Sequence, residues 1–189
     1  MWSGNVVWNL GRLSLLAGCA FGLSCGTNGP TSATPSDGTG MIRSDTALFT
    51  LITQTEPFGS YELFPNLPGN STGSTVSGSS AHQPRIRVSM NAKAFRALQN
   101  GRLPLGTTFP DGSTIFKEVV GSNGATTLYT VMYRERGNSR AGNGWLWAEY
   151  SPEGGTRYSL ANQGRACTGC HSLDQGPRND FVRSFERQQ

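Results

Sequence analysis

Between residues 85 and 150 the chain carries four short runs of strand-forming residues. These runs span residues 85–90, 114–120, 127–134 and 144–150. The first run alternates between polar and apolar side chains, which is the pattern of a half-buried strand. Glycine and asparagine between the later runs favour the tight turns of antiparallel hairpins. The four runs therefore predict an antiparallel β-meander.

Two further segments predict helices. Residues 44–53 start with Ser44, a good N-cap residue, and have apolar side chains at positions 47, 48, 51 and 52, as in an amphipathic helix. Residues 91–100 predict a short helix that ends before Gly101. Its inward-facing side chains are expected to be Ala92, Phe95 and Leu98. The expected fold class is α+β, a predominantly antiparallel β-sheet with a few helices packed on it.

The composition indicates one loop-rich domain. Of the 189 residues, 25 are glycine, 10 are proline and only 15% are charged, which argues against a helical bundle. The length suits a single folded domain with extensions, and we place this domain at residues 44–189. Within it, residues 57–68 predict an ordered loop and residues 70–80 a polar surface loop. No apolar run reaches the ~18 residues that a membrane-spanning helix needs.

The charge pattern gives no reason to expect a nucleic-acid partner. The net charge is +4, but the 16 lysines and arginines are scattered and form no basic stripe. Two of them are lysines, Lys93 and Lys117. Lys93 falls in the second predicted helix, where we expect it at the surface.

Residues 1–25 have the features of a bacterial export signal: one positive charge at Arg12, then a short apolar stretch with small residues near its end. Two cysteines are candidate processing points. The segment ending at Cys19, Leu-Ala-Gly-Cys, is similar to the lipobox of bacterial lipoproteins, in which the cysteine carries the lipid. Cleavage before Cys25 leaves a longer apolar core but puts Gly22 where a lipobox has leucine.

The next segment, residues 26–43, predicts a flexible tether. Its first 15 residues are rich in glycine, serine, threonine and proline and offer nothing to pack. A leash of this kind argues against the alternative that the N-terminal residues form an ordinary buried helix. We expect an exported, periplasmic domain, anchored to the membrane as a lipoprotein or simply secreted.

The chemistry of the chain is concentrated in Cys167-Thr-Gly-Cys-His171, a C-x-x-C-H sequence typical of c-type haem attachment. The thiols of Cys167 and Cys170 would add across the two vinyl groups of one porphyrin, and His171 would ligate the iron. A thioredoxin-like dithiol is less consistent with this position near the C-terminus, because it belongs near the start of a βαβ unit. A zinc site is less consistent with the motif, because zinc needs about four ligands and the motif supplies three. A structural disulfide would leave His171 without a role. One covalently bound haem c is therefore the expected cofactor.

The sixth coordination position of the iron decides between electron transfer, gas binding and catalysis. Candidate ligands are His82, Met90 and Met132. The two methionines fall in or beside predicted strands, where core packing is expected, and His82 follows a polar segment that predicts a surface position. None stands out, which favours an open distal face.

Several motifs occur in the order seen in a known family. They are Arg87-Val-Ser-Met-Asn91, Phe109-Pro-Asp-Gly-Ser-Thr-Ile-Phe-Lys-Glu118, Val131-Met-Tyr-Arg134, Gly144-Trp-Leu-Trp-Ala-Glu149, the haem motif, and Asp180-Phe-Val182. From about residue 44 to residue 185 the chain resembles cytochrome P-460 and its relative cytochrome c′-β. The resemblance implies an antiparallel β-rich homodimer and a five-coordinate haem held by Cys167, Cys170 and His171. It departs at Arg134, where relatives often have lysine, and at Arg183, where they have an aromatic residue.

In the P-460 branch a lysine is also bonded to the porphyrin rim, and Lys117 matches that position best. Strand alternation puts Lys117 on the same face as Ile115 and Val119, as expected for a lysine aimed into a pocket. The alternative is a strand-edge lysine that extends to water. On the last predicted strand, Trp145 and Trp147 suggest packing, and Glu149 is read as a surface partner in preference to a distal acid or base.

Three functions follow. The first is an enzyme that binds hydroxylamine or nitric oxide and passes electrons to a redox partner protein as nitrogen is oxidised. The second is a gas-binding protein of the cytochrome c′-β kind, without turnover. The third is a six-coordinate electron carrier.

Overall fold

The computed structural model describes residues 40–67, 69, 71–72 and 82–188. The predicted export signal, with Cys19 and Cys25, lies outside the described residues, as does nearly all of the predicted tether. No helix in the described part of the chain is long and apolar enough to cross a membrane.

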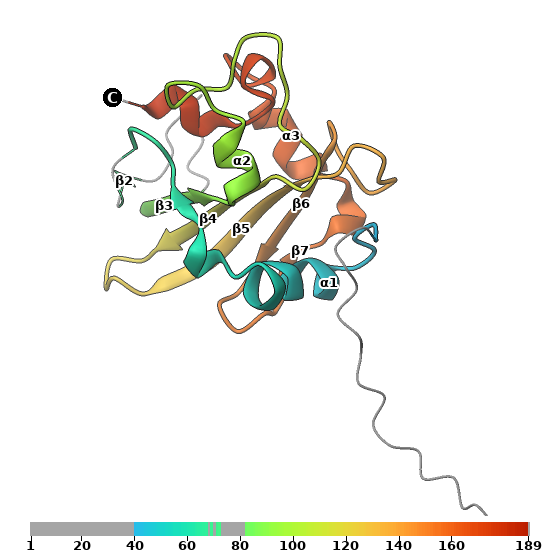
Figure 1. Cartoon of the computed structure of the whole chain (residues 1–189). Coiled ribbons are helices and arrows are strands. Elements are labelled where there is room, and N and C mark those ends of the chain that lie inside the picture. Colours follow the sequence, from blue (N-terminus) through green and yellow to red (C-terminus); the bar gives the residue numbers. More distant parts are fainter. Residues whose placement is uncertain (1–39, 68, 70, 73–81, 189) are drawn as a thin grey trace, which may run out of the picture. The chain divides into compact units, whose positions relative to one another are not determined.

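The centre of the fold is an antiparallel β-sheet of seven strands with the order β1-β3-β4-β5-β6-β7, and β2 pairs with β3 beside this path (Figure 1). The strands are β1 (Glu62–Leu63), β2 (Ser71–Thr72), β3 (Arg85–Met90), β4 (Thr114–Val120), β5 (Thr126–Arg134), β6 (Trp145–Tyr150) and β7 (Thr156–Tyr158). The four predicted strands are β3 to β6, and successive strands pair as the meander requires. The α+β prediction is confirmed.

The sequence did not predict the three shortest strands. Strand β1 lies in the segment expected to be a loop, β2 lies in the predicted surface loop, and β7 follows the turn after β6. Strands of two or three residues are too short to show a period-2 pattern. They form because the edges of β3 and β6 offer unpaired backbone groups to a neighbouring segment.

Each face of the sheet carries its own apolar core, as period-2 alternation dictates. One core contains Ile115, Val119 and Trp147, and the other contains Phe116 and Leu146. Helix α1 (Asp45–Thr50) covers the second face through Leu48. Helix α3 (Arg165–His171) and the C-terminal segment cover the first, and in Figure 1 they lie on the opposite side of the sheet from α1.

The first predicted helix is confirmed as α1 and the π-helical turn Leu51–Thr55 that continues it. Ser44 caps it by accepting a hydrogen bond from the Ala47 N–H at 3.1 Å. Helix α2 (Ala92–Arg96) is shorter than predicted. After it the backbone hydrogen bonds tighten to a spacing of three residues, and Gln99 then pairs with Arg102 across a turn at Asn100 and Gly101, both of which have positive φ values.

The predicted inward face of α2 is wrong for Ala92 and Phe95, which are exposed, and right for Leu98, which packs against the core. Asn91 caps the helix by accepting from the Ala94 N–H at 3.0 Å, and this start point turns Ala94 into the core while Phe95 remains 41% exposed. The partly buried Ala97 and Leu98 complete the packed side. Lys93 is exposed, as expected.

Helix α3, which the sequence did not predict, holds the C-x-x-C-H motif against the sheet. Gly164 precedes it with a φ of 70°, and a Cβ at this position would collide with the Trp147 ring. Glycine therefore allows the start of α3 to approach β6 closely. Short 3₁₀ turns follow at Pro177–Asn179 and Arg183–Arg187.

Candidate functional site

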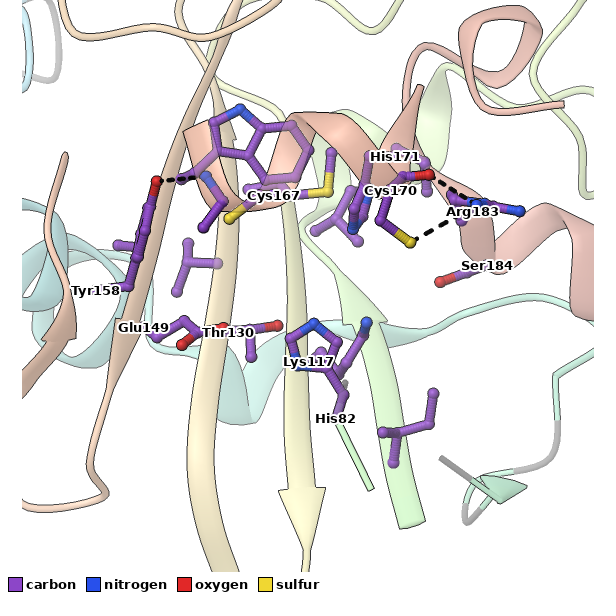
Figure 2. A pocket seen from close by; sticks show the side chains of 18 of the residues that line it. His82, Lys117, Thr130, Glu149, Tyr158, Cys167, Cys170, His171, Arg183 and Ser184 are labelled. Carbon is purple, nitrogen blue, oxygen red and sulfur yellow. Dashed lines mark hydrogen bonds between the residues drawn. The ribbon is translucent and has the colours of Figure 1, made fainter. Parts of the chain in front are cut away.

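A cavity of about 210 Å³ lies between α3 and the sheet. Cys167, Cys170 and His171 line it from the helix, and Lys117, Thr130 and Glu149 line it from strands β4, β5 and β6 (Figure 2). The structure therefore brings Lys117 and the haem motif, separated by 50 residues in the sequence, to one cavity.

The floor of the cavity consists of two rows of side chains across the sheet. Cross-strand pairing aligns Lys117 with Thr130, Thr130 with Glu149, and Glu149 with Tyr158, which gives a polar row. The neighbouring row is apolar and consists of Ile115, Met132 and Trp147. The sequence analysis missed Thr130 and Tyr158, because their membership depends on strand register and not on any local motif.

The two motif cysteines are free thiols, both half-buried. They lie three residues apart on α3 and therefore project from the same side of the helix. Burial and, to a lesser extent, Glu149 raise the pKa of the Cys167 thiol to about 12. A protonated thiol is unlike the low-pKa thiolate of a dithiol oxidoreductase. Among the described residues, no group of three His, Cys, Asp or Glu side chains could hold a metal ion.

The ring of His171 is held in one orientation. Its Nδ1 lies 2.6 Å from the Phe181 carbonyl oxygen, so Nδ1–H donates and Nε2 keeps its lone pair. The Trp147 ring contacts the imidazole edge-on, with 4.7 Å between centroids. Burial, followed by the charge of Lys117, lowers the pKa of His171 to about 4. A neutral imidazole with a free Nε2 is the form that ligates iron.

Lys117 faces this cavity from β4, on the same face as Ile115 and Val119. Burial lowers its pKa to about 8, with a further contribution from the charge of Arg187 and an opposing one from Glu149. An amine with a pKa this low is a neutral nucleophile in an appreciable fraction of molecules near neutral pH.

Two further predictions need correction. His82 does not lie at the surface: it is half-buried and lines the cavity. Its Nδ1 is buried without a hydrogen-bond partner among the described residues, and burial lowers its pKa to about 3. Glu149 is not a surface partner either, since it lines the same cavity, and burial raises its pKa against the lowering effect of Lys117.

The remaining sixth-ligand candidates differ in position. Met132 lines the cavity, whereas Met90 is fully buried in the core and does not line it. Trp147 packs against the cavity, as expected of a packing residue, and Trp145 lies in the core behind it.

The donor set fits a c-type haem: two thiols on one side of a helix, followed by an imidazole with Nε2 free. A model of the cytochrome P460 family matches residues 71–184. The chain belongs to the cytochrome P460 family. Membership of this family implies a haem-binding cytochrome of the c type. The matched region contains Lys117 and the whole C-x-x-C-H motif. A search of curated proteins found no match.

Proposed function

We propose that this cytochrome P460 family member is a periplasmic protein with one covalent haem c, at which hydroxylamine or nitric oxide binds and is oxidised. The observation that carries the proposal is the shared cavity, in which Lys117 faces the same space as Cys167, Cys170 and His171. Haem attachment through a C-x-x-C-H motif needs no lysine, whereas the porphyrin cross-link of the P-460 branch does.

Each residue of the motif has a separate role. The Cys167 and Cys170 thiols would hold the porphyrin through two thioethers, formed by addition of each S–H across a vinyl double bond with no net oxidation or reduction. His171 would bind the iron through Nε2, while its Nδ1–H stays with the Phe181 carbonyl. The haem would supply a redox-active iron at which a small ligand can bind.

The polar row supplies groups that hold or move protons. Glu149, with its raised pKa, is suited to take a proton from a bound nitrogen compound, and Thr130 separates it from Lys117 along the row. His82 is neutral and can accept a hydrogen bond in the cavity. A redox partner protein would receive the electrons.

Lys117 is proposed to bond to the porphyrin edge. The C–N bond would replace one N–H bond of the lysine and one C–H bond of the ring, and the two electrons and two protons released would pass to a two-electron oxidant of the peroxide class. The cross-link would change the electronics of the ring, which is one way in which a protein tunes a haem.

A second candidate is a gas-binding protein without turnover. The apolar row of Ile115, Met132 and Trp147 favours it, because an apolar pocket binds nitric oxide or carbon monoxide without supplying protons. The third candidate, an electron carrier, has Met132 and His82 within the cavity as possible sixth ligands.

The absorption spectrum of the full chain, produced with the cytochrome c maturation machinery, separates the three. A strongly red-shifted Soret band indicates the cross-link, an ordinary high-spin ferric spectrum the gas binder, and a sharp low-spin spectrum the carrier. On a denaturing gel the wild-type band should stain for haem, and Cys167→Ala with Cys170→Ala should abolish the stain. Lys93→Ala, which removes an exposed lysine away from the cavity, serves as the control for Lys117→Ala. Wild-type protein that folds without haem would contradict the proposal.

A further inference from the structure

A buried ion pair lies behind the proximal side of the site. Arg134 at the end of β5 and Asp180 in the C-terminal segment place Nη1 and Oδ1 3.2 Å apart, with side chains only 5% and 2% exposed. Arg134 also donates to the Asn143 carbonyl at 2.8 Å. The second carboxylate oxygen of Asp180 accepts the Phe109 N–H at 2.9 Å. The Asp180 side chain is therefore held from two directions.

The backbone next to this ion pair is constrained as well. The Trp145 Nε1–H donates to the Asp180 carbonyl at 2.9 Å, and the Arg134 guanidinium lies over the Trp145 ring, 5.2 Å from its centroid. Asp180 and Phe181 have φ values of 50° and 66°, a conformation that residues with side chains rarely adopt. Two consecutive residues of this kind persist only where the surroundings hold them, and such strain is common at functional sites.

This constrained turn ends at the proximal imidazole. The carbonyl of Phe181, the second residue of this turn, accepts the Nδ1–H of His171 at 2.6 Å. The Phe181 N–H in turn donates to the Gly176 carbonyl at 2.7 Å. The direction of the Phe181 carbonyl therefore depends on the two residues that the ion pair and Trp145 hold in place. Hydrogen bonding of the second imidazole nitrogen fixes the orientation of a metal-ligating histidine and raises its basicity.

We propose that Arg134 and Asp180 are positioning residues for His171. The buried ion pair keeps the turn at Asp180 and Phe181 in its strained form, so that the Phe181 carbonyl receives a short hydrogen bond from the imidazole. This inference rests on the proposed role of His171 as the axial ligand. Electron density moved onto the imidazole strengthens its bond to iron and stabilises the ferric state, which lowers the reduction potential.

The two departures from the family pattern both act on this part of the chain. Arg183 donates to the Cys170 carbonyl at 2.7 Å and forms ion pairs with Asp174 and Glu186. It therefore holds the end of α3, whereas Arg134 holds the turn that receives His171. Because Arg183 contacts α3 and Arg134 contacts the turn at Asp180, the effect of Arg134 can be tested while Arg183 stays intact.

The test measures the reduction potential and the ferrous iron–histidine stretching frequency of the haem-loaded full chain. Asp180→Asn keeps an acceptor for the Phe109 N–H but removes the negative charge of the ion pair. Arg134→Gln removes the positive charge. Each should move the potential to a more positive value and lower the stretching frequency. Arg134→Lys, which retains the charge, should give a smaller change than Arg134→Gln. The double variant Arg134→Gln with Asp180→Asn leaves no buried charge unpaired and should show the full change.

Leu48→Ala is the control for a general loss of stability. Leu48 is fully buried in the core on the opposite face of the sheet, so its truncation should destabilise the fold without changing the potential. A folded double variant with the wild-type potential and stretching frequency would overturn the inference. A wild-type protein without an iron–histidine band, whose spectrum is unchanged in His171→Ala, would instead overturn the ligand role of His171 in the proposed function.

Discussion

At the scale of single residues, the cavity lowers the pKa of Lys117 and so makes its amine a candidate nucleophile. Burial and, to a lesser extent, the charge of Arg187 lower its pKa to about 8, against the raising effect of Glu149. Strand alternation correctly placed Lys117 with Ile115 and Val119, because β4 is regular along this stretch. The sequence of β4 alone could not show whether the Lys117 side chain is exposed to water or enclosed in a cavity, because α3 and the C-terminal segment form the other side of the cavity.

We therefore expect cross-link formation at Lys117 to depend on pH. Only the neutral amine can form the C–N bond, so the rate after addition of a peroxide-class oxidant should rise through pH 8 and level off about one pH unit higher. Mass spectrometry of tryptic haem peptides would follow the product that joins Lys117 to Cys167 and Cys170.

Two variants test the cause of this pH dependence. Glu149→Gln removes the charge that raises the pKa of Lys117, so the midpoint should move to lower pH. Arg187→Gln removes a charge that lowers it, so the midpoint should move to higher pH. Haem-loaded protein with free Lys117 at every pH would favour the gas-binding function.

At the scale of elements, the site depends on how closely α3 docks on β6. Gly164→Ala introduces a side chain at a φ of 70° and drives it into the Trp147 ring. The positive φ costs about 1–2 kcal/mol, and the overpacking costs about 1–3 kcal/mol more. We expect a corresponding fall in the free energy of unfolding, measured by urea denaturation, together with weaker haem incorporation.

Gly124→Ala is the matched control, because Gly124 has a φ of 84° but nothing within 4 Å of an added Cβ. It should show the backbone cost alone and leave haem incorporation unchanged. Equal losses in the two variants would mean that the contact between Gly164 and Trp147 does not position α3.

At the scale of the whole molecule, the parts of the fold that could be predicted are those encoded within one segment. The strands β3 to β6 appear in the sequence as separate runs of strand-forming residues, and the C-x-x-C-H spacing indicates c-type haem attachment within five residues. The contact between Arg134 and Asp180 joins residues far apart in the chain, and no local pattern indicates it. His82 likewise shares the cavity with Lys117 and His171, which are distant in the sequence, so its polar surroundings in the sequence were misleading.

The last prediction links the two ends of the chain. Haem of the c type is attached outside the bacterial cytoplasmic membrane, and we therefore expect haem attachment at Cys167 and Cys170 to depend on export directed by residues 1–25. Removal of residues 2–25 should leave a colourless cytoplasmic protein in which both thiols react with an alkylating reagent. With the signal intact, fractionation should find haem-loaded protein in the membrane or the periplasm. Whichever of Cys19→Ser and Cys25→Ser releases it from the membrane identifies the lipid-bearing cysteine, and release by neither would favour simple secretion. Haem-loaded protein from the truncated chain would show that residues 1–25 are not needed for export.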